Sequence, residues 1–192
     1  MSGRWFLLKQ FLRHPLQVGA IAPSSEALCK ELVSFLDLGQ TKAVAELGPG
    51  TGVVTKEAIK QCAPDTRFFA VELDKQICEE FKTTLPDVDI LNANACELDK
   101  LCQAEGIKEL DAVVSGLPWA SFPASLQQDI LSAVVKSLKK GGKFSTFAYL
   151  QGMVLPSGRR FRKLLEKEFS EVTLSPVVWK NLPPAIVYRC IK

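Results

Sequence analysis

The residues best suited to chemistry form a short glycine-rich segment, E-L-G-P-G-T-G, which begins at Glu46. Its glycines, Gly48, Gly50 and Gly52, would let the backbone turn sharply and approach a bound ligand where any Cβ would collide. A second acid, Glu72, follows Gly52 by 20 residues, at the end of the next predicted strand. An acid at that position hydrogen-bonds a ribose diol in nucleotide-binding α/β folds. The pattern therefore predicts a site for a nucleotide-like cofactor.

The charge of Glu46 indicates which cofactor this is. Dinucleotide sites use G-x-G-x-x-G and place a pyrophosphate at a helix N-terminus. Here the spacing is G-x-G-x-G, and a carboxylate just ahead of it would repel a pyrophosphate but suit a sulfonium or ammonium group. The segment thus favours S-adenosylmethionine, and it resembles the first motif of the class I S-adenosylmethionine-dependent methyltransferases.

The resemblance continues through the cofactor-binding motifs. The stretch V-E-L-D, residues 71–74, resembles the family's second motif, which implies that Glu72 holds the ribose hydroxyls and that Leu73 contacts the cofactor. Asn94 and Ala95 fall in the family's adenine-contacting turn, although the common residue at position 94 is Asp. Ser24 precedes a predicted helix at 26–36 and is expected both to cap it and to lie over the cofactor.

A fourth motif indicates the reaction. The stretch S-G-L-P-W, residues 115–119, stands where N-methyltransferases carry N-L-P-Y or N-P-P-Y, with Gly in place of Asn. This form resembles the bacterial phospholipid N-methyltransferases, which methylate phosphatidylethanolamine. That family also begins with a segment like residues 11–25 and closes with one like 181–188, so the resemblance covers essentially the whole chain. It implies four catalytic residues, the first of which also touches the cofactor: Ser115, Gly116, Leu117 and Pro118.

The same resemblance implies the substrate contacts. The acceptor would be the amine of phosphatidylethanolamine or of its monomethyl and dimethyl forms, methylated by direct displacement without a metal. A quaternary ammonium product favours aromatic faces, for which Trp119 and Tyr188 are the candidates. Arg159 and Arg160 are candidates for binding the lipid phosphate.

Charge and amphipathicity predict a membrane partner. The net charge is only +3, but residues 136–168 hold nine basic and two acidic residues. A predicted helix at 4–14 places Trp and Leu side chains opposite basic ones, which suits an anionic membrane interface. We therefore expect residues 1–25 to form an interfacial segment that covers the cofactor, on a methyltransferase domain at 26–192. No apolar run is long enough to span a bilayer. The six cysteines form no C-x-x-C pair, which favours reduced thiols, so the expected location is cytoplasmic, peripheral to the inner face of the cell membrane.

Alternating strands and helices predict an α/β fold: one Rossmann-like domain with a mostly parallel seven-stranded sheet. The last two strands are joined by a short turn, so they should form a hairpin with the final strand antiparallel. Strands are expected at 43–47, 67–73, 88–92, 111–115, 143–149, 171–179 and 185–191. Further helices are expected at 53–62, 75–83, about 123–139, where Gly141 and Gly142 would follow the helix end, and 159–169.

Several alternatives stay open at this point. The basic segments and the L-P-W sequence also suit an RNA adenine N-methyltransferase, although the missing Asn and the lack of an RNA-binding domain argue against nucleic acid. A methyltransferase-like module that binds the cofactor without turnover is a further possibility. The helix at 4–14 could simply pack on the domain, Trp119 could be a core residue, and residues 181–184 could be only a hairpin loop.

Overall fold

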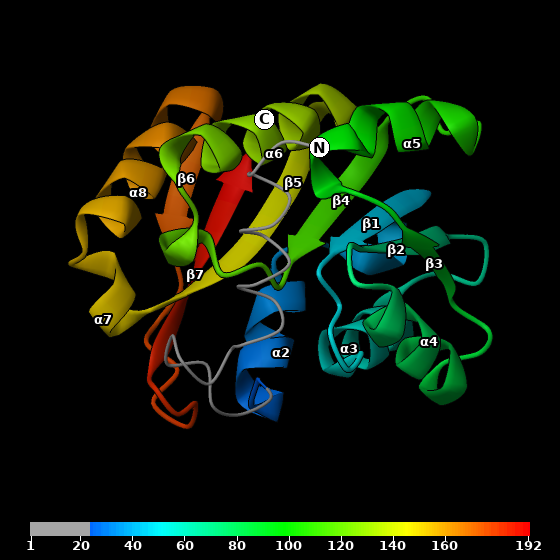
Figure 1. Cartoon of the computed structure of the whole chain (residues 1–192), viewed down its shortest axis with the longest axis horizontal. Helices are drawn as coiled ribbons and strands as arrows, with labels where there is room; N and C mark the ends of the chain where they lie inside the picture. The colour runs from blue at the N-terminus through cyan, green and yellow to red at the C-terminus, as the bar shows by residue number, and fades with distance from the viewer. Residues whose placement is uncertain (1–23) are drawn as a thin grey trace.

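A computed structural model describes residues 24–192, and the predicted helix at 4–14 lies outside them. It confirms the predicted α/β fold, with one seven-stranded sheet in the order β3-β2-β1-β4-β5-β7-β6 (Figure 1). The strands are β1 (Ala43–Leu47), β2 (Arg67–Glu72), β3 (Asp89–Asn92), β4 (Leu110–Ser115), β5 (Leu138–Tyr149), β6 (Glu171–Leu174) and β7 (Ala185–Ile191). The α-helices are α2 (Glu26–Ser34), α3 (Val53–Gln61), α4 (Lys75–Thr84), α5 (Leu98–Ala104), α6 (Ala124–Ser137), α7 (Leu150–Met153) and α8 (Pro156–Glu168). Short 3₁₀ turns are η2 (Leu38–Gln40), η3 (Ala95–Glu97) and η4 (Trp119–Ser121).

The direction of β7 determines what lies at the carboxyl edge of the sheet. Strand β1 pairs in parallel with β2 and β4, whereas β7 pairs antiparallel with both β5 and β6, as predicted. Tyr149, the last residue of β5, is therefore paired with Ala185, the first residue of β7. The loop that leads into β7 consequently lies at the same edge as the glycine-rich turn and α7.

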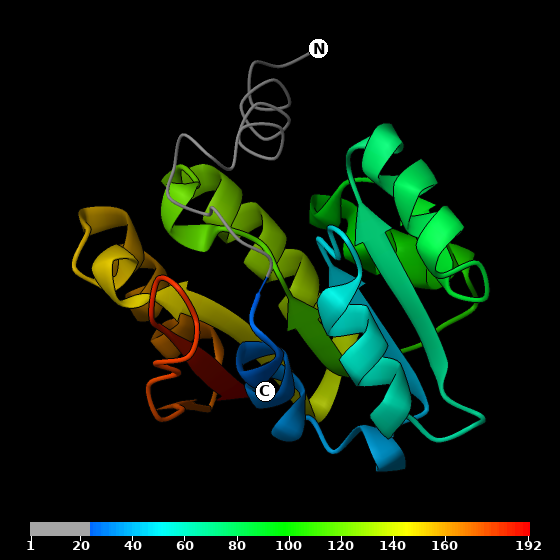
Figure 2. The same ribbon diagram turned by 90° about the horizontal axis from the view of Figure 1, so that it is seen from below.

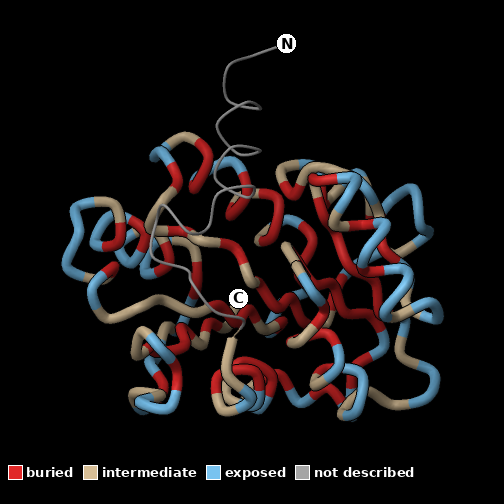
Figure 3. The backbone as a smooth tube through the Cα atoms, turned by 60° about the horizontal axis from the view of Figure 1, so that its bottom comes forward, coloured by how far each residue is buried: buried red, intermediate tan, exposed pale blue. Residues whose placement is uncertain are grey.

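Helices cover both faces of the sheet. Helices α5, α6 and α8 pack on one face, and α2, α3 and α4 pack on the other (Figures 1 and 2). The buried residues run along the strands between these layers, while the outer helix surfaces and loops are exposed (Figure 3). Within the described part of the chain, no helix combines the length and the hydropathy that a bilayer crossing requires.

The structure corrects several details of the predicted elements, and it contains a short helix, α7, that was not predicted. Helix α6 ends at Ser137, and the two glycines expected to follow the end of a longer helix lie inside β5. A Cβ at Gly142 would lie 2.8 Å from the carbonyl oxygen of Lys139, next to an irregularity in the β4–β5 pairing, so glycine serves a strand bend there. Helix α5 was not predicted, and β6 is four residues long instead of nine.

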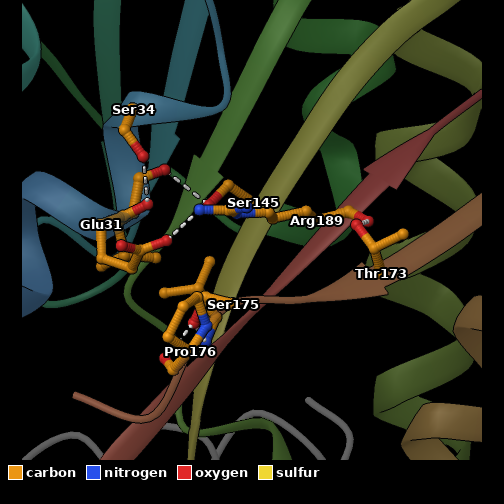
Figure 4. A network of polar contacts seen from close by, with 9 residues as sticks. Glu31, Ser34, Ser145, Thr173, Ser175, Pro176 and Arg189 are labelled. Carbon is orange, nitrogen blue, oxygen red and sulfur yellow. Dashed lines mark hydrogen bonds and ion pairs between the residues drawn. The ribbon is translucent and has the colours of Figure 1, made fainter.

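Polar contacts fix α2 against the sheet. The Ser145 hydroxyl donates to the Leu32 carbonyl at 2.6 Å, and the Arg189 guanidinium of β7 forms an ion pair with Glu31 (Figure 4). The N-cap of α2 is Ser25, whose Oγ accepts the Leu28 N–H at 3.2 Å, so the predicted cap at the preceding serine is wrong by one residue.

Candidate active site

The glycine-rich turn joins β1 to α3 and requires glycine for two reasons. Gly48, Gly50 and Gly52 have φ angles of 67°, 53° and 78°, a backbone conformation that residues with a Cβ rarely adopt. A Cβ at Gly48 would also lie 2.6 Å from Leu117 Cδ2, and one at Gly52 would lie 2.7 Å from Leu85 Cδ1. Around Gly50 there is open space instead, and this residue borders a cavity. The turn is thus packed tightly at both ends and open to a ligand in its middle.

The S-G-L-P-W turn follows β4 and contacts the glycine-rich turn through the backbone. The Gly116 N–H donates to the Leu47 carbonyl at 2.9 Å, and a Cβ at Gly116 would lie 2.6 Å from the Gly48 carbonyl oxygen. This close approach excludes the asparagine that N-L-P-Y motifs carry at the same position. The Leu117 carbonyl accepts the Trp119 N–H at 3.0 Å, whereas no hydrogen bond reaches the Gly116 carbonyl from the described residues.

Ser115 holds the S-G-L-P-W turn in place through hydrogen bonds. Its side chain is fully buried, and its Oγ accepts the Trp119 Nε1–H at 3.1 Å and the Leu117 N–H at 3.3 Å. Its carbonyl accepts the Thr146 hydroxyl at 3.0 Å. Ser115 does not line the cavity, so the structure gives it a positioning role, and its predicted contact with the cofactor stays a prediction.

Glu46 lies fully buried at the end of β1, on the face of the sheet that α3 covers. Its Oε2 accepts the Thr55 hydroxyl at 2.6 Å, but its Oε1 has no hydrogen-bond partner among the described residues. Burial raises the pKa of Glu46 to about 7, while the Thr55 hydrogen bond opposes this shift. A buried carboxylate oxygen without a partner is costly, and a cationic ligand group or a bound water would offset that cost.

Glu72 is the last residue of β2, and it lines a narrow cavity and a larger one at the carboxyl edge of the sheet. Its Oε1 accepts the N–H groups of Leu73 at 2.8 Å and Asp74 at 3.0 Å. Burial raises the pKa of Glu72, and these two backbone hydrogen bonds act in the opposite direction. A narrow cavity beside it is lined by Leu73, Ala95 and Leu117, with Gly48, Val71, Ala93 and Ile130. The predicted ribose-binding acid and three further predicted cofactor contacts, Gly48, Leu73 and Ala95, therefore surround one small cavity.

A larger cavity of about 350 Å³ extends from Gly48, Gly50 and Glu72 toward α7 and α8. The whole segment from Gly116 to Ser121 lines it, so three of the four predicted catalytic residues border it directly. Five aromatic side chains complete its wall: Trp119, Phe147, Tyr149, Phe161 and Tyr188. Of the described residues that line it, Glu72 carries the sole carboxylate, and none is His, Lys or Arg.

Comparison with known proteins identifies the family. Residues 44–142, just over half of the chain, match the family model described as "Methyltransferase domain". The chain belongs to this family. It is 32% identical to the ornithine lipid N-methyltransferase of Singulisphaera acidiphila, over 99% of this chain and 96% of that relative. It is also 30% identical to the ribosomal RNA small subunit methyltransferase A of Mycoplasmoides gallisepticum, over 46% of this chain and 32% of that relative.

Solved structures agree with this assignment at the level of the fold. The O-methyltransferase from Bacillus cereus in complex with SAH superposes with a TM-score of 0.72 at 15% identity, covering 95% of this chain and 91% of that one. The protein is thus a class I S-adenosylmethionine-dependent methyltransferase, and the resemblance read from its motifs is confirmed.

The residues present in the methyltransferase fit S-adenosylmethionine. Gly50 leaves the backbone beside the cavity accessible, the buried Glu46 Oε1 receives no hydrogen bond from residues 24–192, and Glu72 is the last residue of β2. These features accommodate, respectively, a close-lying ligand, a positive charge and a sugar diol.

Some predicted site residues of the methyltransferase lie outside both cavities. Arg159 and Arg160 are exposed on α8, because the helix turns Gly158 and Phe161 toward the cavity instead. The Asn94 side chain caps η3, with its Oδ1 accepting the Cys96 N–H at 3.0 Å. Neither cavity is lined by Ser24. The predicted ligand contacts of these residues stay predictions.

Other cavity residues were missed by sequence reasoning. Phe147 and Tyr149 lie two residues apart at the end of β5. Gln151 and Met153 come from α7, and Phe161 comes from α8. The available signal was the aromatic pair at the carboxyl end of a strand beside β4, the edge where α/β proteins bind ligands. Ile77 of α4 also lines the cavity, and nothing in its sequence context distinguishes it.

Proposed function

We propose that this methyltransferase transfers methyl groups from S-adenosylmethionine to the amine of a membrane lipid. The near full-length similarity to a protein named as a lipid N-methyltransferase supports this class of acceptor. One observation carries the proposal: the cavity that begins at the cofactor motifs continues as an apolar, aromatic-lined space toward α7 and α8. A small polar acceptor would not need such a wall, whereas a lipid with an amine headgroup would.

The cofactor would be held by Glu46, the glycine-rich turn and Glu72, and it supplies an electrophilic methyl group on a sulfonium. Leu73 and Ala95 would lie beside its base. The turn at 116–118 would position the acceptor nitrogen. No described residue donates a hydrogen bond to the Gly116 carbonyl, so it can accept an N–H from the incoming amine and aim the lone pair of the nitrogen. Positioning of this kind contributes roughly 7–11 kcal/mol in favourable cases.

The acceptor amine must be neutral to act as a nucleophile. Because the described lining offers no His or Lys and Glu72 is engaged by two backbone N–H groups, we propose that the proton leaves to water. Each methylation then adds apolar bulk to the headgroup and restores the single positive charge of its nitrogen, and the third methylation makes that charge permanent. Tyr188 and Trp119 line the cavity and would stabilise a quaternary product by about 0.5–2 kcal/mol per aromatic face.

Two lipid acceptors are compatible with this site. Phosphatidylethanolamine is the acceptor implied by the S-G-L-P sequence, and an ornithine lipid is the one in the relative's name. Both carry a primary amine beside acyl chains, and we propose phosphatidylethanolamine and its partly methylated forms at an anionic membrane surface on the cytoplasmic side. RNA is the weaker candidate, because the ribosomal RNA methyltransferase matches cover 46–66% of this chain and 32–44% of those relatives, and Gly116 leaves no room for the amide of N-L-P-Y motifs.

A methyl-transfer assay with tritiated S-adenosylmethionine tests the proposal. The acceptors are vesicles of phosphatidylethanolamine, vesicles containing ornithine lipid, and total RNA, offered side by side. We expect label in the lipid fraction, with phosphatidylethanolamine preferred. Label confined to RNA would overturn the proposal in favour of the RNA enzyme, and cofactor binding without transfer to any acceptor would favour an inactive binding module.

A further inference from the structure

The most exposed hydrophobic side chains of the described chain gather at one edge of the molecule. Leu182 and Trp179 are 81% and 72% exposed, and Val154 and Leu155 are 63% and 48% exposed. We call these four residues the apolar rim. Single exposed hydrophobic residues are ordinary on protein surfaces, but a group of this size at one place marks an interaction surface.

The topology brings the two parts of the apolar rim to the same side of the molecule. Trp179 and Leu182 lie in the loop before β7, and Val154 and Leu155 connect α7 to α8. The Leu150 N–H donates to the Pro184 carbonyl at 3.0 Å, which joins the start of α7 to the end of that loop. Both segments lie at the same side of the molecule in two perpendicular views (Figures 1 and 2).

The loop before β7 is held in place by its interior residue. Asn181 is 3% exposed, its Oδ1 accepts the Ser25 N–H at 2.9 Å, and its Nδ2 donates to the Pro183 carbonyl at 2.7 Å. These bonds fix the loop against the start of α2, while the side chains on either side of Asn181 project into solvent. The exposure of Trp179 and Leu182 is therefore built into an anchored loop.

The charges beside the apolar rim are basic. Lys180 stands between its two loop residues, and α8 carries a basic cluster immediately after Leu155: Arg159, Arg160, Arg162 and Lys163. The segments 149–165 and 172–192 contain no Asp or Glu, and neither does the active-site turn at 115–122. Two acids adjoin these segments, and both are in ion pairs: Glu26 at the start of α2 pairs with Lys30, and Glu166 of α8 pairs with Arg162. A surface that combines exposed Trp and Leu with an excess of basic residues complements an anionic lipid bilayer.

We propose that the apolar rim is the surface on which the enzyme docks to an anionic phospholipid bilayer, with Trp179 and Leu182 inserted at the headgroup level. This inference rests on the proposed lipid substrate and identifies the surface that delivers it. Leu155 belongs to the rim and also lines the large cavity, so the cavity opens where the bilayer would lie. A lipid headgroup can then pass from the membrane to the 116–118 turn while its acyl chains stay among apolar side chains.

The test compares the full-length protein with the W179S/L182S variant. Both are sedimented with phosphatidylcholine vesicles prepared with and without phosphatidylglycerol. We expect the unsubstituted protein to bind the anionic vesicles preferentially. The variant should show a partition coefficient lower by a factor of about ten or more, because two inserted apolar side chains are lost. The matched control is I59S, which removes an exposed hydrophobic residue near the end of α3, a helix that runs away from the carboxyl edge.

Folding and catalysis are checked separately from docking. Calorimetric titration with S-adenosylmethionine should give the same affinity for both variants and the unsubstituted protein, which shows that the domain is folded. Methyl transfer to a short-chain phosphatidylethanolamine dispersed as monomers should also persist in W179S/L182S, whereas transfer to the same headgroup in anionic vesicles should fall about tenfold.

The outcomes separate the docking surface from the proposed function. Equal sedimentation of W179S/L182S and the unsubstituted protein would overturn the docking proposal, and so would an unsubstituted protein that binds no vesicles. A dimer that the double substitution dissociates, measured by analytical ultracentrifugation, would assign the apolar rim to a second copy of the chain. Loss of vesicle binding in the variant, with no lipid methylated by any form, would support the docking surface and refute the lipid substrate.

Discussion

The buried carboxyl of Glu46 should make the stability of the cofactor-free enzyme depend on pH. Burial raises its pKa from 4.5 to about 7. Between these values the folded protein binds more protons at Glu46 than the unfolded chain does, so the free energy of unfolding falls as pH rises through this window. At 1.36 kcal/mol per pKa unit, the loss attributable to Glu46 is about 3 kcal/mol above about pH 7.

The Glu46→Gln substitution isolates this contribution. Glutamine keeps the shape of the side chain and an acceptor for the Thr55 hydroxyl, but it cannot ionise. Its buried amide N–H groups lower stability by about 1–3 kcal/mol, and because this cost is the same at every pH it does not hide the loss of the pH-dependent contribution of Glu46. Urea unfolding from about pH 5 to about pH 8 should show that the unsubstituted protein loses about 3 kcal/mol more than the variant. Parallel curves for the two proteins would refute the reasoning.

The same group links pH to cofactor affinity. If the unpartnered Oε1 faces a cationic group of S-adenosylmethionine, binding favours the carboxylate, so affinity should rise with pH through the same window and proton release should accompany binding at about pH 6. Calorimetry in two buffers of different ionisation enthalpy measures this release. The Glu46→Gln variant should bind more weakly and release no such proton. Equal proton release by the variant would show that Glu46 does not sense the ligand.

Two further substitutions test the active-site turn. Ser115→Ala should lower stability by about 1–3 kcal/mol, because the buried Nε1–H of Trp119 loses its acceptor, and adding Trp119→Phe should recover part of the loss in chemical denaturation; no recovery would mean that the bond is not the cause. Gly116→Ala should lower stability by about 1–3 kcal/mol and weaken cofactor binding, since its Cβ would lie 2.6 Å from a backbone oxygen. The control Gly39→Ala, with its nearest atom at 3.4 Å, should change little, and equal effects of the two would contradict the steric argument.

Local chemistry determined much of this protein from the sequence. The glycine spacing after Glu46 requires positive φ angles and a ligand-facing turn, and alternating apolar segments require a sheet between helices. The short connection before β7 fixed its antiparallel direction, because no helix is available to carry the chain back. These features depend on residues close together in the chain, so they can be read without a structure.

The tertiary structure alone decided which side chains share the cavity. Position 116 requires glycine because a Cβ there would collide with the carbonyl oxygen of Gly48. The motif comparison showed only that the usual asparagine is absent. Phe147 and Tyr149 reach the cavity because β5 lies beside β4, whereas Arg159 and Arg160 face away because of the rotation of α8.

The apolar rim also arises only in three dimensions. Residues 154–155 and 179–182 are separated by more than a full helix and strand in the sequence, and each pair alone is an unremarkable apolar spot. They lie at the same edge because β7 runs antiparallel and brings its preceding loop to the end of β5. The sequence determines the local backbone conformation and which side of each strand or helix is buried. Contacts between distant segments depend on strand order and helix rotation, which only the packing of the core determines.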